Sequence, residues 1–489
     1  MTARGVCQAI ALLLLTVSLA GFVTGALCLF VARSPRDVEA SQIFVEYFGL
    51  CSAFLLPVIL AFRRGFEITI PEAFLVVALS WLLIPALSIY PYVATAALDP
   101  LDAYFEALSG FSGTGLTMIA KPEDMPMVVL LWRALTQWMG ELGVVVFAGT
   151  LLPKIHRTIR SVYIVERGER IAPTIVMTMR KLLAIYVLYT AIGTILFMLG
   201  GMDPFNALTH TMTAIATGGM STSSGSIGTW IGTSNHFLYT SSIVIMVLGA
   251  LNFADHDLLL KGRIRSFLSS TEVRWFFIFL AIFATMLGIY AYLSNDMDRM
   301  YIWFYHLVSG YTTTGFQLTS STEIEHDPDF VKVVLILSMI VGGATFSTAG
   351  GVKIRRAAIA FKALVWNCAR TFAPPTMVMG FRVGRESLEE REVLAVLSFI
   401  MTYLLTLTIL TLVVHVSLVI SGFTEFSFVD ALFETTSAMS CVGLSVGITS
   451  TSTPLATKVA LMVAMYLGRL EFAPLYLAIG YSYVSKVSL

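Results

Sequence analysis

The chain has 489 residues, of which 57% are hydrophobic and only 13% are charged, and its formal net charge is zero. Its mean hydropathy is +0.81, whereas soluble domains carry about 25% charged residues. This composition excludes an ordinary soluble protein, and the balanced charge implies no nucleic-acid partner.

Apolar stretches long enough to cross a bilayer recur along the whole chain. We expect about ten spanning helices, near residues 8–32, 43–62, 72–94, 126–152, 173–199, 236–253, 274–294, 330–352, 393–421 and 456–484. The first follows Arg4 as a signal peptide would, but its apolar run is too long, so we interpret it as an uncleaved helix. With the N-terminus inside, 23 of the 31 Lys and Arg residues face the cytoplasm, in line with the positive-inside rule. The sequence therefore predicts a multi-pass protein of the cytoplasmic (inner) membrane, embedded in the lipid bilayer, with a cytoplasmic N-terminus.

A short polar stretch recurs four times between the apolar ones. Its four copies read "SGTG", "ATGG", "TTTG" and "SCVG", and their final glycines lie 104, 96 and 128 residues apart. Each repeat unit then holds two spanning helices with the polar stretch between them. We call these tetrapeptides the glycine segments; their residues are Ser112, Gly113, Thr114 and Gly115; Ala216, Thr217, Gly218 and Gly219; Thr312, Thr313, Thr314 and Gly315; and Ser440, Cys441, Val442 and Gly443.

The residues before each glycine segment predict a helix too short to span the membrane. Asp99-Pro100 and Asp203-Pro204 mark two of the starts, because Asp suits the N-cap and Pro the first helical position. The charge bias places the entry of these half-helices on the outer face. Non-helical backbone at membrane depth is allowed only where protein encloses it or where it lines a water-filled path. Nine residues before the final glycines, the alignment brings together Glu106, His210, His306 and Glu434.

The predicted fold is therefore an all-α integral membrane protein. Four parallel helix–pore loop–helix repeats surround a central pore, and an N-terminal helix pair lies outside them. We expect the N-terminal pair in residues 1–70 and the four repeats in residues 71–155, 156–265, 266–370 and 371–489.

The glycine segments offer backbone carbonyls and hydroxyls but no carboxylate. Such groups replace the water shell of a weakly hydrated monovalent cation, whereas a divalent cation calls for carboxylates. An extended segment whose carbonyls all face one axis needs φ angles of alternating sign, and only glycine takes positive φ freely. The C-terminal ends of the half-helices carry partial negative charge and would point at the same cation.

This arrangement resembles the Trk/Ktr/HKT superfamily of potassium transporters, and its length and N-terminal pair are similar to the Trk-type membrane subunit. The resemblance covers roughly residues 70–489 and includes "WRALTQWMGELGVVVF" (132–147), "GALNFADHD" (249–257), "GGATFSTAGGVKI" (342–354) and "GRLEFAPLYL" (468–477). It implies potassium uptake, with the sixteen residues of the glycine segments as the selectivity filter and K⁺ site. In plant members a serine at the first of these glycines is associated with sodium permeation. The four glycines here favour potassium, although "SCVG" is the least typical segment. A sodium-permeable or a proton- or sodium-coupled cation transporter of the same fold is the alternative.

Two glycine pairs bracket small and hydroxyl residues in "GGATFSTAGG", which we call the 342–351 loop. Glycine pairs permit unwound backbone, although close helix packing by small residues is the other interpretation. The resemblance implies an intramembrane gate beneath the filter, built from Gly342, Gly343, Thr345, Ser347, Thr348, Gly350, Gly351 and Arg469.

Two arginines, Arg133 and Arg469, lie within apolar stretches, where a charge is costly and marks a functional candidate. Arg469 has Glu471 and Glu434 as possible ion-pair partners. The resemblance instead implies that it projects into the pore beneath the filter and opposes cation leak. For Arg133 we favour a structural role, in which it binds carbonyls of a half-helix, over a functional one.

Other function classes fit less well. Transporters of other solutes usually show two inverted halves, whereas this chain shows four parallel repeats. An enzyme is not expected, because the sequence has no nucleophile–base set, metal-ligand spacing or nucleotide-binding loop. The resemblance also implies a homodimer, potassium as transported ion rather than cofactor, and a nucleotide held only by a cytosolic Trk A-type regulatory ring. That ring would face the basic loops at 153–172, 261–274 and 353–391.

Overall fold

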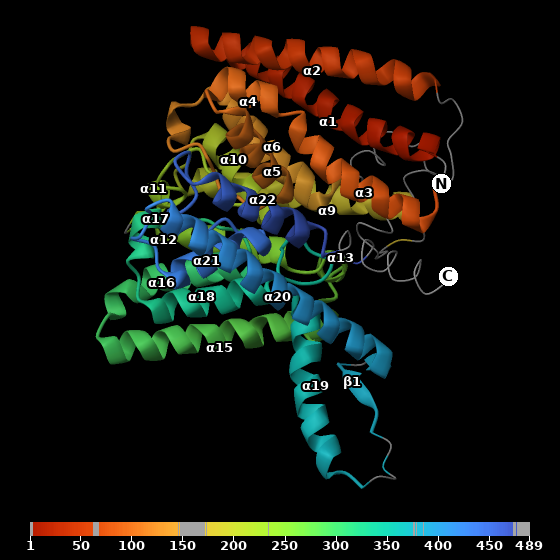
Figure 1. Ribbon diagram of the computed structural model, residues 1–489, viewed down its shortest axis with the longest axis vertical. Coiled ribbons are helices and arrows are strands. Elements are labelled where there is room, and N and C mark those ends of the chain that lie inside the picture. Colours follow the sequence, from red (N-terminus) through yellow and green to blue (C-terminus); the bar gives the residue numbers. More distant parts are fainter. Residues whose placement is uncertain are drawn as a thin grey trace.

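The structure is a computed structural model that describes residues 3–61, 68–144, 146, 172, 174–232, 234–374, 377, 379–384, 386–472 and 476. Nearly all of its elements are helices (Figure 1).

The N-terminal pair is α1 (Ala3–Val31) and α2 (Pro35–Ala61). The first repeat holds α3 (Ile70–Ala86), α4 (Ile89–Ala96), α5 (Pro100–Ser112), η1 (Pro122–Asp124) and α6 (Met127–Leu142), and the second holds α9 (Ile175–Leu199), α10 (Pro204–Ile215), α11 (Gly228–Ile231), α12 (His236–Ala250), α13 (Phe253–Leu260) and α14 (Ile264–Ser269). The third holds α15 (Thr271–Ser294), η3 (Met297–Arg299), α16 (Met300–Tyr311), α17 (Ser321–Glu325), α18 (Asp329–Val341) and α19 (Ile354–Phe372), and the fourth holds α20 (Glu390–Ile420), α21 (Phe428–Met439) and α22 (Leu455–Arg469).

The long apolar helices confirm the membrane-protein interpretation. Within the described residues, six helices are long and apolar enough to cross a membrane, or seven if the bent pair α12–α13 counts as one span. They match the expected spans at both N-terminal helices, at the first helix of every repeat and, through the bent pair, at 236–253. Of the other three expected spans, 126–152 and 456–484 run beyond the described residues, and each begins as a helix, α6 and α22.

The expected span at 330–352 is not a continuous helix, and its break lies where the glycine pairs of the 342–351 loop predicted unwound backbone. Helix α18 stops at Val341, and the chain becomes helical again only at Ile354. Gly342 has a φ of +67°, which ends the helix although the apolar composition continues. The following helix, α19, projects away from the bundle (Figure 1).

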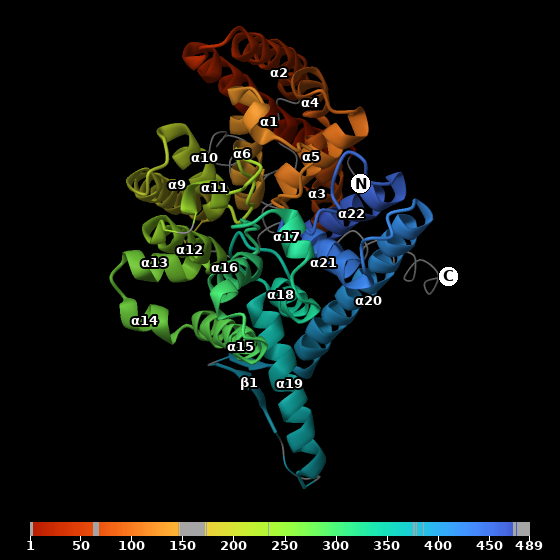
Figure 2. The ribbon, with the colours of Figure 1, turned by 90° about the vertical axis from the view of Figure 1, so that its left-hand side faces the viewer.

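A small β-hairpin returns the chain from α19 and was not predicted. Strands β1 (Phe381–Val383) and β2 (Glu386–Leu388) pair antiparallel, with Arg382 opposite Ser387. Residues from α19, the hairpin and α20 form a separate small apolar cluster that includes Ile359, Phe381 and Val393. This arm projects from the rest of the molecule in both ribbon views (Figures 1 and 2).

Each repeat contains the short helix predicted before its glycine segment. These four half-helices, α5, α10, α16 and α21, have 12 or 13 residues. Asp203 caps α10 by accepting from the backbone N–H groups of Phe205 and Asn206, and Ser427 forms a capping box at α21. Helix α16 begins after a 3-10 turn instead, which explains why its start is poorly marked in the sequence. The half-helices lie around a common centre, with one repeat on each side (Figure 2).

Candidate functional site

The four glycine segments meet in a closed ring. A Cβ added to Gly115 would lie 2.1 Å from the carbonyl oxygen of Gly218, and one added to Gly219 would lie 2.0 Å from that of Thr314. A Cβ added to Gly315 would lie 2.0 Å from the carbonyl oxygen of Val442, and one added to Gly443 would lie 2.4 Å from that of Thr114. Each final glycine therefore faces the carbonyl of the next repeat, and the last contact returns to the first repeat.

Backbone φ angles alternate in sign along every segment. The final glycines have φ between +71° and +96°. The second position of each segment also has positive φ, although three of its four residues, Thr217 (+49°), Thr313 (+54°) and Cys441 (+54°), are not glycine. Non-glycine residues rarely adopt this conformation and pay for it in strain. Such strain at three equivalent positions indicates a backbone shaped for a purpose other than stability.

The aligned residues nine positions before the final glycines brace the chain that follows each segment. Glu106 accepts from the Met118 N–H (2.8 Å) and Glu434 from the Val446 N–H (3.0 Å). In the third repeat, His306 Nε2 accepts from the Leu318 N–H (3.0 Å). In the second, His210 Nε2 lies 2.8 Å from the Ser221 hydroxyl. All four side chains are fully buried, so one device fixes the outer end of every glycine segment.

Arg133 has the structural role that the sequence favoured. It is 2% exposed and pairs with Glu106, with 2.8 Å between Nε and Oε1. It also donates to the Ser221 carbonyl of the second repeat (2.7 Å). The carbonyl it binds follows a glycine segment and does not belong to a half-helix, which corrects that detail of the expectation.

Buried ion pairs hold neighbouring repeats together at their outer ends. Lys332, at the start of α18, pairs with Asp430 at the start of α21 (2.7 Å). Lys458, at the start of α22, pairs with Asp102 at the start of α5 (2.5 Å). Because both partners are almost completely buried, removing one of them leaves an uncompensated charge.

A cavity of about 230 Å³ lies beside the ring and is lined by the chain that follows each glycine segment. All four final glycines line it, as do hydroxyl-bearing residues from all four repeats, for example Thr117, Ser221, Ser321 and Thr449. The oxygens of this lining belong to neutral groups, as suits a hydrated monovalent cation, and Arg133, paired with Glu106, also lines the cavity.

The 342–351 loop packs beneath the ring. Its ends are closed by backbone hydrogen bonds from Val352 to Ile340 (2.8 Å) and from Lys353 to Val341 (3.0 Å). The Gly350 N–H donates to the Thr313 hydroxyl (2.8 Å). A Cβ added to Gly350 would lie 1.9 Å from the Ser440 carbonyl oxygen. The glycines thus permit contact with the third and fourth segments.

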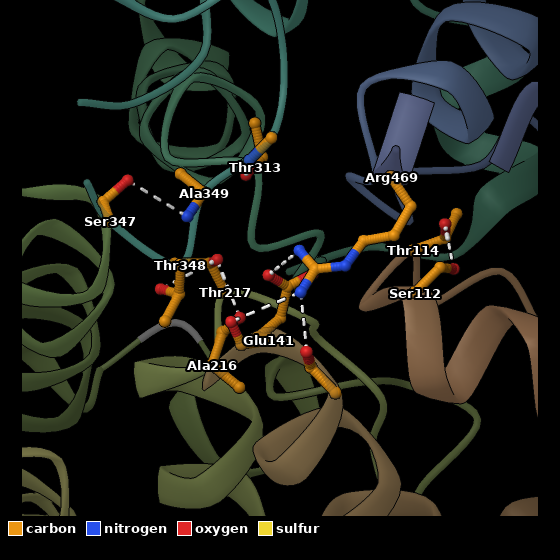
Figure 3. Close-up of polar contacts among 12 residues, drawn as sticks. Ser112, Thr114, Glu141, Ala216, Thr217, Thr313, Ser347, Thr348, Ala349 and Arg469 are labelled. Carbon is orange, nitrogen blue, oxygen red and sulfur yellow. Dashed lines mark hydrogen bonds and ion pairs between the residues drawn. The ribbon is translucent and has the colours of Figure 1, made fainter. Parts of the chain in front are cut away.

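The loop touches the second segment as well. The Thr348 hydroxyl donates to the Gly249 carbonyl (2.8 Å) and lies 3.2 Å from the Thr217 hydroxyl, beside which Figure 3 shows it. The loop therefore contacts three of the four glycine segments from below.

Arg469 pairs with neither of the partners that the sequence suggested. Its Nη1 lies 2.7 Å from Glu141 Oε2, and its Nη2 donates to the Gly140 carbonyl (2.6 Å) (Figure 3). Glu471 instead pairs with Arg356, and Glu434 braces the fourth segment. Glu141 also supports the first segment, since a Cβ added to Gly113 would lie 1.9 Å from its Oε1. Arg469 and Glu141 are thus joined directly below the ring.

Several hydroxyls expected to face the axis are engaged elsewhere. The Thr312 hydroxyl donates to the Val308 carbonyl (2.7 Å). The Thr314 hydroxyl lies 2.9 Å from the Thr312 hydroxyl. The Ser440 hydroxyl lies 2.7 Å from that of Tyr403. Backbone carbonyls rather than side-chain oxygens therefore make the ring.

Several residues of this site have roles that were not predicted from the sequence. Gln137 was missed although its amide donates to the Gly218 carbonyl (2.6 Å) and accepts from the Met220 N–H (3.0 Å). Glu141 was missed as the partner of Arg469, although an acidic residue between apolar stretches was a usable signal. Glu106, His210, His306 and Glu434 were aligned, but their shared role of bracing the chain after each glycine segment was not predicted.

The comparisons with known proteins agree over most of the chain. Residues 40–482 match the family described as "TrkH: Cation transport protein". An uncharacterized cation transporter of Methanocaldococcus jannaschii is 29% identical over 84% of this chain and 83% of its own length. The Trk system potassium uptake protein TrkH of Escherichia coli is also 29% identical, over 83% of this chain and 84% of its own.

A solved structure agrees over nearly the full length. The crystal structure of the potassium transporter TrkH from Vibrio parahaemolyticus superimposes with a TM-score of 0.81 at 26% identity and covers 98% of both chains. The chain belongs to the TrkH family of cation transport proteins.

Proposed function

We propose that this protein takes up potassium across the cytoplasmic membrane through the ring of glycine segments. The observation that carries the proposal is the closed contact of each final glycine with the carbonyl of the next repeat. Oxygens arranged in this way replace the hydration shell of a monovalent cation without any carboxylate. The E. coli and V. parahaemolyticus relatives are named as potassium transporters, which supports K⁺ as the ion.

The sixteen residues of the glycine segments form the selectivity filter in this proposal, one segment from each of the four expected repeats. A sodium-permeable transporter is the second candidate, and the "SCVG" segment favours it. Its middle residues, Cys441 and Val442, are residue types that occur in none of the other three segments. The assigned activity is transport and not catalysis.

The 342–351 loop and the Arg469–Glu141 pair form the gate in this proposal. The loop packs against three glycine segments and is held by hydrogen bonds rather than by a continuous helix. A segment of this kind moves at lower cost than a packed helix. The Arg469 guanidinium adds positive charge below the ring, which opposes the passage of cations.

Two partners belong to the proposal. A cytosolic nucleotide-binding ring would bind basic segments at 261–274 and 353–391; the third expected contact, 153–172, lies outside the described residues. A second copy of the chain would pack on the projecting arm, where α19 exposes Phe361 (54%), Leu364 (65%) and Phe372 (89%). The basic segments also support a cytoplasmic N-terminus.

Ion flux into proteoliposomes tests the proposal. Purified protein should admit K⁺ and Rb⁺ in preference to Na⁺. Measurement with and without a proton gradient, at a fixed membrane potential, separates a passive pathway from coupled transport. Equal fluxes of Na⁺ and K⁺ would favour the second candidate, and no flux of either ion would refute both.

A further inference from the structure

The tip of the 342–351 loop is held by one buried carboxylate that lies outside the loop. Glu272, in the first turn of α15, is 8% exposed. Its Oε1 accepts from both the N–H (3.0 Å) and the hydroxyl (2.6 Å) of Thr345. Its Oε2 accepts from the Asn252 side-chain amide (2.7 Å). One side chain therefore joins the loop tip to two other elements.

Asn252 is itself part of the sharp bend between α12 and α13. The two helices meet at 114°, and Asn252 caps α13 by accepting from the Ala254 N–H (2.8 Å). The loop docks on this bend through backbone hydrogen bonds from Ala344 to Ala250 (2.9 Å) and from Phe253 to Phe346 (2.8 Å). The bend, Glu272 and the loop thus form one hydrogen-bonded unit.

We propose that Glu272 is the positioning residue of the gate: it clamps the 342–351 loop beneath the glycine segments by bridging Thr345 and Asn252. This inference rests on the proposed function of the loop. A carboxylate suits the position because it has two acceptor oxygens and here receives three donors. Hydrogen bonds to a charged group are stronger than hydrogen bonds between neutral groups. Each hydrogen bond to Glu272 therefore stabilises the loop more than one of the neutral hydrogen bonds around it.

The surroundings of the clamp allow it to open. Glu272 and Asn252 line a cavity of about 420 Å³ together with Arg355 at the base of α19. The Glu272 side chain can therefore leave Thr345 without displacing the packed core. Opening of the clamp requires that the two hydrogen bonds from Thr345 to Glu272 break.

Glu272→Gln is the sharpest perturbation, because it preserves shape but leaves a single acceptor oxygen. The new amide group must point at the Asn252 amide, which donates to this site, or at Thr345, whose backbone N–H is also a donor. In either orientation at least one N–H loses its acceptor. We expect unstimulated Rb⁺ flux into proteoliposomes to rise about tenfold, the scale of one lost charge-assisted hydrogen bond. The Rb⁺/Na⁺ ratio should stay at its wild-type value, because the glycine segments are untouched.

Asn252→Asp in the Glu272→Gln background should reverse the effect. The introduced aspartate keeps one oxygen for the Ala254 N–H and offers the other to the amide of the introduced glutamine. The oxygen of that glutamine can then accept again from Thr345. Thr345→Val tests the clamp from the loop side, and its effect should not add to that of Glu272→Gln. Glu386→Gln, in the same cavity but paired with Arg355, is the matched control and should keep wild-type flux.

The outcomes separate this inference from the function on which it rests. Wild-type flux in Glu272→Gln, beside a leaky variant lacking residues 343–349, would overturn the clamp and leave the gate intact. Failure of Asn252→Asp to restore low flux would also overturn it. If neither the wild-type protein nor the deletion variant conducted cations, the proposed function would fall and the clamp with it.

Discussion

Gly115→Ser should weaken the preference for potassium over sodium. Gly115 has a φ of +85°, and its added Cβ would meet the Gly218 oxygen at 2.1 Å. Ordinary contact requires that oxygen to retreat by about 1 Å. Gln137 resists the movement because it donates to the same carbonyl (2.6 Å). The substitution therefore distorts a carbonyl that is held from both sides.

The size of the effect follows from this geometry. A side chain at left-handed φ costs about 1–2 kcal/mol, and the displaced carbonyl is the easiest place to relieve it. If that energy is transferred to the coordination of the cation, the K⁺ preference falls by a factor of about 5–30. The assay is competitive uptake of Rb⁺ and Na⁺ into proteoliposomes at equal protein density.

Gly422→Ser is the matched control. Gly422 has a φ of +86° and no neighbouring atom within 4 Å of an added Cβ, so it carries the same backbone strain away from the ring. Its Rb⁺/Na⁺ ratio should equal that of the wild type. An unchanged ratio in folded Gly115→Ser protein, or an equal loss in Gly422→Ser, would refute the reasoning.

Further predictions address the gate and the repeat interfaces. Arg469→Ala should raise basal Rb⁺ flux because positive charge is removed below the ring. Unchanged flux in folded protein would show that Arg469 is only a structural partner of Glu141. Deletion of residues 343–349 should leave the pathway open without a stimulus, and a folded but silent variant would argue against a gate there. Lys458→Met should destabilise the protein by about 3–5 kcal/mol because Asp102 is left charged and unpaired. In thermal unfolding in detergent, adding Asp102→Asn should recover much of that loss, and the two substitutions should not add.

The sequence predicted the parts of the site that depend on local chemistry. Asp203 and Pro204 mark a helix start that the structure contains, and the final glycines do adopt positive φ. Comparison of the four repeats identified a glycine segment even where the helix start before it is poorly marked. Helix α16 has no Asp–Pro start, yet Gly315 aligned correctly from its partners. Hydropathy continues across Gly342, but the glycine pairs predicted a break in the helix there, and the structure contains it.

The contacts between distant residues could not be predicted in the same way. Arg469 and Glu141 are 328 positions apart, and Lys458 and Asp102 are 356 apart. Nothing in the local pattern distinguishes these partners from others of the same charge. Glu471 was the nearer partner for Arg469 along the chain, but Arg356 binds it in the folded protein. Only the packing of the repeats decides among them.

The ring of unlike segments has a consequence for how selectivity can change during evolution. In a pore assembled from four identical subunits, one codon change alters all four sides at once. Here each quarter is encoded separately, so a mutation changes one side and leaves the other three as they were. Ion preference can therefore shift in small steps, and the divergence of "SCVG" from "TTTG" is the kind of difference that such a history leaves.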